Sequence, residues 1–218
     1  MNLYIFPLIA LALFAVLRYF RGNKQNRWLS GCISAETEAI LNPKDTNYVN
    51  IGGSIGYNFT YQLSAPLKEA KGTFALIPRH SAFYLPVVFL VGGKDRYFLT
   101  IYSKEKLIGE GHIIEEKYFS KISETIDGIA KLKRDRVSRG KKNYILLWDN
   151  PKLEAKLKEL IQTVEQSELL RHFCCFRDNS NFYLFMQPKK DGVTAVLGSI
   201  YPQFKKFWEG KNNGGTET

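Results

Sequence analysis

Apolar residues along this chain form one long run and several short ones. Residues 1–17 carry no charged side chain, and Arg18, Tyr19 and Phe20 extend this segment to 20 residues. At 1.5 Å per residue, a helix of that length spans the roughly 30 Å apolar core of a bilayer. Aromatic residues lie near both of its ends, as they do at membrane–water interfaces. We therefore predict a transmembrane anchor helix over residues 1–20.

The charges that follow the run predict its orientation. Four basic residues come before the first acid: Arg18, Arg21, Lys24 and Arg27. Basic residues beside a membrane helix stay in the cytosol, so the N-terminus should face outward and the rest of the chain inward. A cleaved signal peptide is the main alternative, but it requires a basic start and a small-residue cleavage site. Here the start has no Lys or Arg, and the run ends in Arg-Tyr-Phe-Arg. A buried core helix is the other alternative.

Shorter periodic patterns predict one domain over residues 21–210 and a disordered tail over residues 211–218. Helical spacing predicts helices at 27–41, 118–137, 152–166 and 191–208. Alternation predicts a strand pair or a bent strand at 49–63, and strands at 73–77, 96–102, 144–148, 169–176 and 182–186. Residues 80–91 suit either a helix or a buried strand. The mixture, with a hairpin joining the last two strands, indicates an α+β fold with a mixed or antiparallel sheet and packed helices.

Charge and cysteine content change this picture. The chain has 31 Lys and Arg against 21 Asp and Glu, and a net charge of +10 favours an anionic neighbour such as lipid or nucleic acid. Seven cations form a second cluster opposed only by Asp135: Lys131, Lys133, Arg134, Arg136, Arg139, Lys141 and Lys142. Both clusters are candidate contacts with the membrane or with ribosomal RNA, while a solvated helix end is the alternative for the second. Three cysteines make a poor disulfide framework and favour a reducing compartment.

Metal and nucleophile chemistry find little support in the sequence. In a strand, His172 and Cys174 would point to one face and Cys175 to the other. Two ligands do not make a zinc site, and no second Cys/His pair stands elsewhere in the sequence, so we expect a buried strand with small apolar thiols. A cysteine nucleophile remains open only in one combination, which no motif supports: Cys32 with His80 or His112.

Two further motifs have ordinary structural interpretations. The segment 52–56, Gly-Gly-Ser-Ile-Gly, precedes a strand rather than a helix, so a turn or bulge is expected instead of a nucleotide-binding loop. The glycosylation sequon Asn58-Phe59-Thr60 should be unused on the cytosolic side and fits a strand that contains a threonine. We expect no enzyme, no cofactor and no metal.

The order of several short motifs resembles the calumin family, coiled-coil-domain proteins of the endoplasmic reticulum that belong to the PAT complex. The clearest match is the Gly-Asn-Lys-x-Asn-Arg stretch at 22–27, directly after the membrane helix. The resemblance covers nearly the whole chain and is carried by Tyr19–Arg27, Tyr48-Val49-Asn50-Ile51-Gly52-Gly53, Asp95-Arg96-Tyr97-Phe98-Leu99, Phe182-Tyr183-Leu184-Phe185 and Ile200–Phe207.

The resemblance implies a non-enzymatic membrane-protein biogenesis factor. Such a protein would be a subunit of an intramembrane chaperone complex that assists the insertion and folding of multipass proteins at the Sec61 translocon. Implied partners are Sec61, an Asterix-like small membrane protein, multipass clients, membrane lipids and ribosomal RNA, and the implied location is the endoplasmic reticulum membrane. The family's acidic lumenal segment and its long charged coiled coil are not in this sequence. We therefore expect a reduced form, without calcium binding or ribosome contact through that coil.

Two other functions remain open. A membrane-anchored enzyme or lipid-handling domain of unknown substrate would use the apolar stretch 80–91 to line a pocket. A cavity lined by Cys32, His80 or His112 would favour it, whereas a solid core with a basic face near the anchor would favour the biogenesis factor. The third function is that of a bacterial envelope protein with the same layout.

Overall fold

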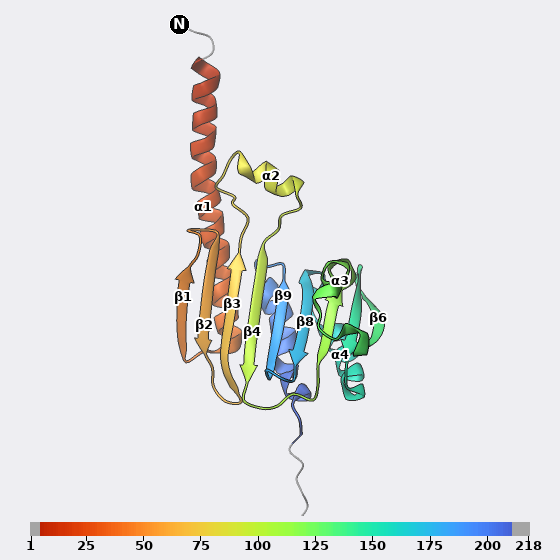
Figure 1. Ribbon diagram of the computed structural model, residues 1–218. Coiled ribbons are helices and arrows are strands. Elements are labelled where there is room, and N and C mark those ends of the chain that lie inside the picture. The colour runs from red at the N-terminus through yellow and green to blue at the C-terminus, as the bar shows by residue number, and fades with distance from the viewer. Residues whose placement is uncertain (1–4, 211–218) are drawn as a thin grey trace, which may run out of the picture.

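Nine antiparallel strands in one sheet organise the chain, in a computed structural model that describes residues 5–210 (Figure 1). The order across the sheet is β1-β2-β3-β4-β9-β8-β5-β7-β6. The strands are β1 (Asp45–Asn50), β2 (Gly56–Gln62), β3 (Leu67–Ala75), β4 (Arg96–Ser103), β5 (Gly111–Glu115), β6 (Lys133–Arg139), β7 (Lys142–Trp148), β8 (Leu170–Phe176) and β9 (Asn181–Met186). Together with the helices below, this confirms the α+β prediction, and the sheet is antiparallel rather than mixed.

One long helix, α1 (Ile5–Leu41), joins the apolar N-terminus to the sheet. Its large apolar side chains are exposed up to Phe20, and this half projects beyond the sheet (Figure 1). From Gly22 onward buried residues follow one face of the helix, which packs first on the loop at 77–80 and then on the sheet: Gly22, Asn26, Leu29, Ser30, Ile33, Thr37 and Leu41. The predicted anchor and the predicted helix at 27–41 are therefore one helix, which ends before Asn42-Pro43 as expected.

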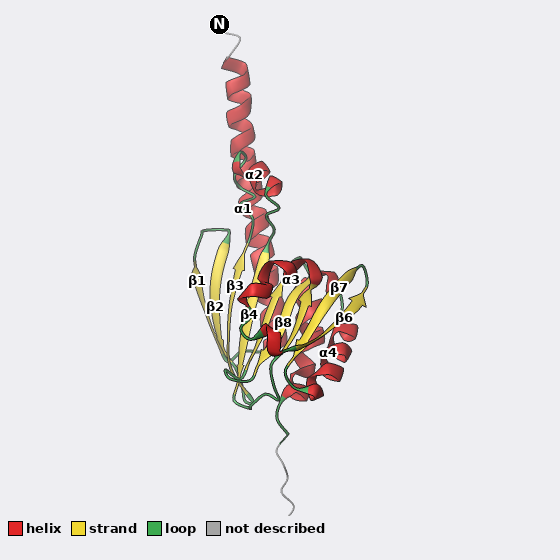
Figure 2. Ribbon diagram, turned by 45° about the vertical axis from the view of Figure 1, so that its right-hand side comes forward, coloured by secondary structure: helices red, strands yellow, loops and turns green. Residues whose placement is uncertain are grey.

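The packed half of α1 shares its face of the sheet with three further elements (Figure 2). These are α4 (Pro151–Thr163), α5 (Gly192–Ile200) and the 3₁₀ helix η4 (Tyr201–Phe207), whose apolar residues merge with those of the sheet into the main core. Asn150 caps α4 by accepting a hydrogen bond from the Lys152 backbone N–H at 3.0 Å.

The opposite face carries a smaller helical layer over β5 and β7. It consists of α3 (Glu116–Ile122) and the 3₁₀ turns η1 (Ser123–Thr125) and η2 (Ile129–Lys131). A second hydrophobic cluster fills the space between this layer and the strands, built on Ile114, Ile145 and Leu147 with Tyr118, Phe119, Ile122, Ile126, Ile129 and Leu132.

Most predicted strands are confirmed, including the pair β1–β2 at 49–63 and the hairpin β8–β9. The glycine-rich segment 52–56 forms the β1–β2 turn, where Gly53 has a φ of 63°, and the sequon lies in β2. The strand predicted at 73–77 begins earlier, at Leu67. The tail at 211–218 lies outside the described residues.

Two helix predictions need correction, and the choice left open for residues 80–91 is decided. The single helix at 118–137 is wrong: α3 ends at Ile122, Gly128 takes a φ of 67°, and the basic segment that follows pairs with β7 as strand β6. The last helix ends at Ile200 and continues as η4, where Pro202 has no N–H for an α-helical bond. Residues 80–91 contain the short helix α2 (Tyr84–Leu90), which is largely exposed rather than buried.

A polar cluster, Asn26–Arg79–Asp95, ties α1 to the loops that enter and leave α2. Asn26 is fully buried; its Nδ2 donates to the Ile77 carbonyl oxygen at 3.0 Å, and its Oδ1 accepts from Arg79 Nη1 at 2.9 Å. Arg79 also forms an ion pair with Asp95, whose Oδ1 accepts from the Ile77 backbone N–H at 2.8 Å. Close approach requires Gly22, because a Cβ there would lie 2.2 Å from the Arg79 backbone. Both loops are thus fixed to the helix.

We expect Asn26→Ala to lower the free energy of unfolding by about 1–3 kcal/mol, because it removes both hydrogen bonds from α1 to this loop and leaves buried polar groups unpaired. The measurement is urea unfolding of the full chain in a neutral detergent, followed by tryptophan fluorescence. Gln25→Ala, at the exposed neighbouring position, is the control and should cost less than about 0.5 kcal/mol. Equal stability of the two variants would contradict this role of Asn26.

Candidate functional site

The strand register brings distant parts of the sequence to one end of the sheet, which we call the α2 end (Figure 1). β3 leads into α2 and β4 leaves it, so Ala75 and Arg96 lie at this end. Antiparallel pairing then places the end of β9, the start of β8, the end of β5, the start of β7 and the end of β6 beside them.

The segment around α2 presents an apolar surface. Leu85 and Val88 are its buried residues. The other large apolar side chains are exposed, from 49% for Val87 to 86% for Leu90: Phe83, Tyr84, Val87, Phe89, Leu90 and Val91. A contiguous cluster of this kind marks contact with another protein or with a membrane. The ring of His80, just before α2, meets the ring of Tyr19 edge-on with centroids 5.9 Å apart. The surface therefore begins where the exposed half of α1 ends.

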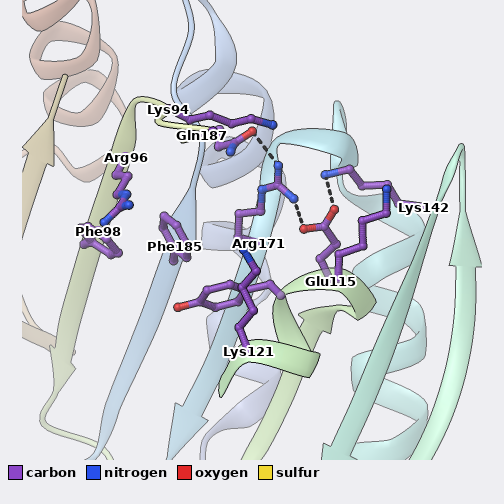
Figure 3. Close-up of a pocket in the computed structure, with 12 residues that line it drawn as sticks. Lys94, Arg96, Phe98, Glu115, Lys121, Lys142, Arg171, Phe185 and Gln187 are labelled. Carbon is purple, nitrogen blue, oxygen red and sulfur yellow. Dashed lines mark hydrogen bonds and ion pairs between the residues drawn. The ribbon is translucent and has the colours of Figure 1, made fainter. Parts of the chain in front are cut away.

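A pocket of about 590 Å³ opens at the α2 end, on the face that carries α3 (Figure 3). We call it the basic pocket, because it is lined by six cations and one acid: Lys94, Arg96, Lys117, Lys121, Lys142, Arg171 and Glu115. Aromatic rings line it as well. Phe98 stacks on Phe185 with centroids 4.6 Å apart, and Tyr118 meets Phe185 edge-on at 5.1 Å.

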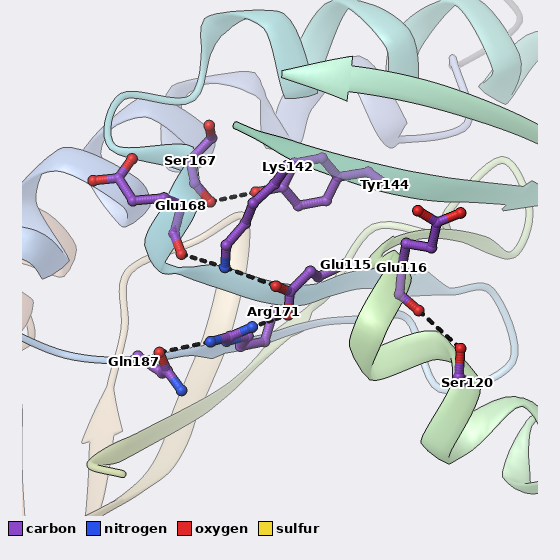
Figure 4. A network of polar contacts seen from close by, with 9 residues as sticks. All are labelled: Glu115, Glu116, Ser120, Lys142, Tyr144, Ser167, Glu168, Arg171 and Gln187. Carbon is purple, nitrogen blue, oxygen red and sulfur yellow. Dashed lines mark hydrogen bonds and ion pairs between the residues drawn. The ribbon is translucent and has the colours of Figure 1, made fainter. Parts of the chain in front are cut away.

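Glu115 neutralises two of the six cations (Figure 4). Arg171 forms an ion pair with Glu115 and donates to Gln187 Oε1 at 2.7 Å. Lys142 Nζ lies 2.9 Å from Glu115 Oε1 and donates to the Glu168 carbonyl oxygen at 2.6 Å. Burial is the main cause that lowers the pKa of Lys142 and of Arg171. Because the buried Nε of Arg171 has no hydrogen-bond partner among the described residues, an unused donor remains there.

The other four cations of the basic pocket have no ion pair with any residue between Ile5 and Gly210: Lys94, Arg96, Lys117 and Lys121. An entering anion would meet these charges unopposed, and its field would also offset the cost of burying Lys142. Phosphate and carboxylate are the groups that Arg and Lys bind best in such sites. The basic pocket is therefore suited to a phosphate-bearing group that also has surface to place on the rings.

The eleven cations singled out from the sequence fall into separate places. Arg18, Arg21, Lys24 and Arg27 lie on α1 around the point where it reaches the sheet. The second cluster does not form one patch, since β6 runs the length of the sheet edge. Lys131, Lys133 and Arg134 lie at the end opposite α2, whereas Arg139, Lys141 and Lys142 lie at the α2 end. Arg136, between them, pairs with Glu116 at 2.8 Å. Charges along an edge strand also oppose pairing with other chains.

Most of the basic pocket was missed from the sequence. Of the predicted cations, only Lys142 lines it, and the other five come from the α2–β4 loop, β4, α3 and β8. One signal was available: in β4, the inward alternation of Tyr97, Leu99 and Ile101 places Arg96 and Phe98 together on the other face.

The suggested cysteine–histidine nucleophile pairs are not formed. Cys32 lies on α1, on the sheet face opposite to His112, which faces α3. His80 contacts Tyr19, and thirteen residues of helix separate Tyr19 from Cys32, or roughly 20 Å. Residues 80–91 line neither the basic pocket nor a second pocket that contains His112. Each of the two leading functions has one of its expected features. The basic end of the sheet lies on the side from which α1 projects, as expected for the biogenesis factor. A cavity is lined by His112, as expected for an enzyme or lipid-handling domain.

Comparison with known proteins gives no identification. No protein-family model matches the chain, and no curated protein matches it. The resemblance to the calumin family therefore stays a prediction.

We expect the double variant Arg96→Glu/Lys121→Glu to weaken binding of a soluble headgroup analogue, inositol trisphosphate, at least tenfold. Each cation contributes about 1 kcal/mol to such binding, and 1.4 kcal/mol corresponds to a factor of ten. Isothermal titration of the full chain in a neutral detergent measures the affinity. The control, Lys133→Glu/Arg134→Glu, makes the same change in net charge at the opposite end of the sheet. Equal losses in the two variants would show that only overall charge matters.

Proposed function

We propose that this protein is a single-pass membrane protein whose cytosolic domain lies against the bilayer through α2 and binds phosphate-bearing lipid headgroups in its basic pocket. The observation that carries the proposal is the exposed apolar surface of residues 83–91, which lies at the end of the sheet from which the apolar half of α1 projects (Figure 1). Two apolar elements on one side of a domain favour attachment to a membrane at that side.

The character of α1 supports the anchor. This is a candidate membrane-spanning helix, of which only 6% of the most apolar stretch is buried, so burial in a core does not account for its apolarity. The helix continues unbroken past the basic residues, and from Gly22 onward its face packs on the sheet. A signal peptide is instead followed by an accessible cleavage site before the folded chain begins.

The depth of α2 follows from its link to α1. Tyr19 lies near the end of the apolar run, where aromatic rings mark the membrane interface. Because His80 packs on Tyr19, and the Asn26–Arg79–Asp95 cluster fixes the same loop, α2 lies at interfacial depth. Its exposed residues, such as Phe89 and Leu90, then enter the apolar layer while the basic pocket faces the headgroups. The positive-inside rule places this face in the cytosol.

Depth-dependent quenching tests the proposal. The full chain carries Leu90→Cys labelled with an environment-sensitive fluorophore, in a Cys32→Ser background because the other two cysteines are buried. In vesicles whose acyl chains bear nitroxide groups, we expect several-fold stronger quenching at position 90 than at the control position, Lys71→Cys, an exposed site in β3. Equal quenching at the two positions would place α2 in water and overturn the proposal.

Membrane-protein biogenesis at the Sec61 translocon of the endoplasmic reticulum is a second candidate function. One observation favours it: the apolar surface of α2 lies beside α1 (Figure 1), where a membrane helix of a client protein could pack. The resemblance to the calumin family supplies the partners, and the basic end of the sheet would face headgroups or ribosomal RNA.

A mild-detergent pull-down of the tagged full chain from its own membranes, identified by mass spectrometry, tests this second function. We expect recovery of the Sec61 channel together with a small Asterix-like protein, and loss of both in the variant Phe89→Glu/Leu90→Glu. The control is Lys71→Glu, an exposed substitution away from α2. Recovery of a soluble enzyme instead, or of no partner, would argue against the biogenesis role.

A further inference from the structure

A second pocket lies on the same face of the sheet as the basic pocket, towards the end opposite α2. Its volume is about 680 Å³, and Tyr118 lines both pockets. Strands β5 and β8 form one wall, and residues of α3 and η1 form the cover. Four acids line it against a single cation: Glu110, Asp127, Asp149 and Asp178 against Arg177. Its charge is thus opposite to that of the basic pocket, and a cation is the ligand that it favours.

The register of β5 and β8 gathers three metal-binding side chains in this pocket. His112 stands opposite Cys174, and His172, two residues before Cys174, points to the same face. All three residues are buried, and one possible ligand atom from each, a ring nitrogen of His112, a ring nitrogen of His172 and Cys174 Sγ, lies within 4.8 Å of the other two. The sequence shows only His172 and Cys174 together, because the third ligand comes from a strand that is sixty residues away in the chain.

The spacing fits a tetrahedral ion. His112 Nδ1 and His172 Nε2 are 3.1 Å apart. Zinc binds imidazole nitrogen at about 2.0–2.1 Å, so two nitrogens on a tetrahedral zinc ion lie roughly 3.3 Å apart. The present separation needs a change of only about 0.2 Å to reach that value. Cys174 Sγ lies within 4.8 Å of a nitrogen of each histidine. A zinc–sulfur bond of about 2.3 Å places the sulfur roughly 3.6 Å from such nitrogens, so the thiol has to move closer when the ion binds.

The carboxylate of Glu110 lies beside His112, where it can orient that imidazole and determine which ring nitrogen carries the proton. Glu110 Oε1 lies 2.8 Å from His112 Nε2. When that nitrogen donates its proton to the carboxylate, the lone pair of Nδ1 points to His172 and Cys174. Carboxylate–histidine–zinc arrangements of this kind orient the imidazole and raise its basicity. The neighbour of Cys174 behaves differently: Cys175 faces the main core, and its Sγ contacts the Gly111 carbonyl oxygen.

The environment suits neutral nitrogen ligands. Both imidazoles are buried in the wall of the pocket, and burial disfavours their charged forms, which cannot bind a metal. Burial raises the pKa of the Cys174 thiol well above its ordinary value, with Cys175 and Glu110 adding to the effect. A divalent cation reverses this second effect, because a coordinating thiol loses its proton.

We propose that His112, His172 and Cys174 bind a zinc ion, with Glu110 as the carboxylate that orients His112. Three protein ligands leave a fourth position, which a water molecule from the pocket can occupy. Nitrogen and thiolate ligands in tetrahedral arrangement select zinc over magnesium or calcium, which take oxygen ligands. This site does not depend on the membrane function proposed above.

Metal titration tests the site directly. The full chain, purified in detergent and freed of metal, is titrated with Zn²⁺ against a chromophoric chelator and separately with Co²⁺. We expect one ion per chain and, with Co²⁺, the thiolate-to-metal charge-transfer band and the intense visible bands of tetrahedral coordination. Absence of these bands in the wild-type chain would overturn the proposal, whatever the variants do.

Matched variants assign the ligands. Cys174→Ser should abolish the charge-transfer band and weaken zinc binding at least a hundredfold, whereas Cys175→Ser, one residue away on the other face, should keep both. Glu110→Gln should lower zinc affinity about 10–100-fold and leave the band in place, as expected for an orienting residue. Circular dichroism of each metal-free variant verifies folding. If a folded Cys174→Ser chain bound zinc as tightly as the wild type, the ion would be held elsewhere and the assignment would be wrong.

Discussion

The hydrogen bonds of Asn26 to the loop at Ile77 and Arg79 fix the position of the α2 segment relative to α1. Asn26 is an amide buried in a helix, and its partners are the backbone and guanidinium of a loop far away in the sequence. The ion pair between Arg79 and Asp95 extends the connection to the second loop. Because both loops border α2, these contacts fix the position of α2 relative to α1. Without this cluster, α2 would be a short apolar helix between two loops that no polar contact fixes to α1.

One face of the sheet is divided by charge. At the α2 end, cations from β4, α3, β7 and β8 surround a single neutralised acid, Glu115. Farther down, acids surround two histidines and a cysteine. The helix α3 contributes to both pockets, and Tyr118 stands between them. The net charge of +10 therefore does not reveal that the two pockets carry opposite charge. The charge of each pocket depends on which strands are neighbours in the sheet.

The sequence predicted elements far better than it predicted sites. The strand predicted at 144–148 and the helix predicted at 152–166 depend on local pattern, and both are confirmed as β7 and α4. The basic segment after Gly128 was taken for a helix end, because its charges mask the alternation of an edge strand. Apart from the β8–β9 hairpin, the order β4-β9-β8-β5-β7 has no signal in the local sequence pattern. Arg96 and Arg171, like His112 and Cys174, meet only through that order, so neither pocket could be derived from spacing along the chain.

Because α1 is continuous, its exposed apolar half and the sheet form one rigid body. Its 37 residues make a rod of about 55 Å, with no break between its exposed and packed halves. A membrane helix responds to bilayer thickness by changing its tilt. With α1 spanning a bilayer as proposed above, such a tilt would rotate the whole sheet as well, and α2 would move deeper into the membrane or out of it. The thickness of the surrounding bilayer would then set how closely the basic pocket approaches the lipid surface.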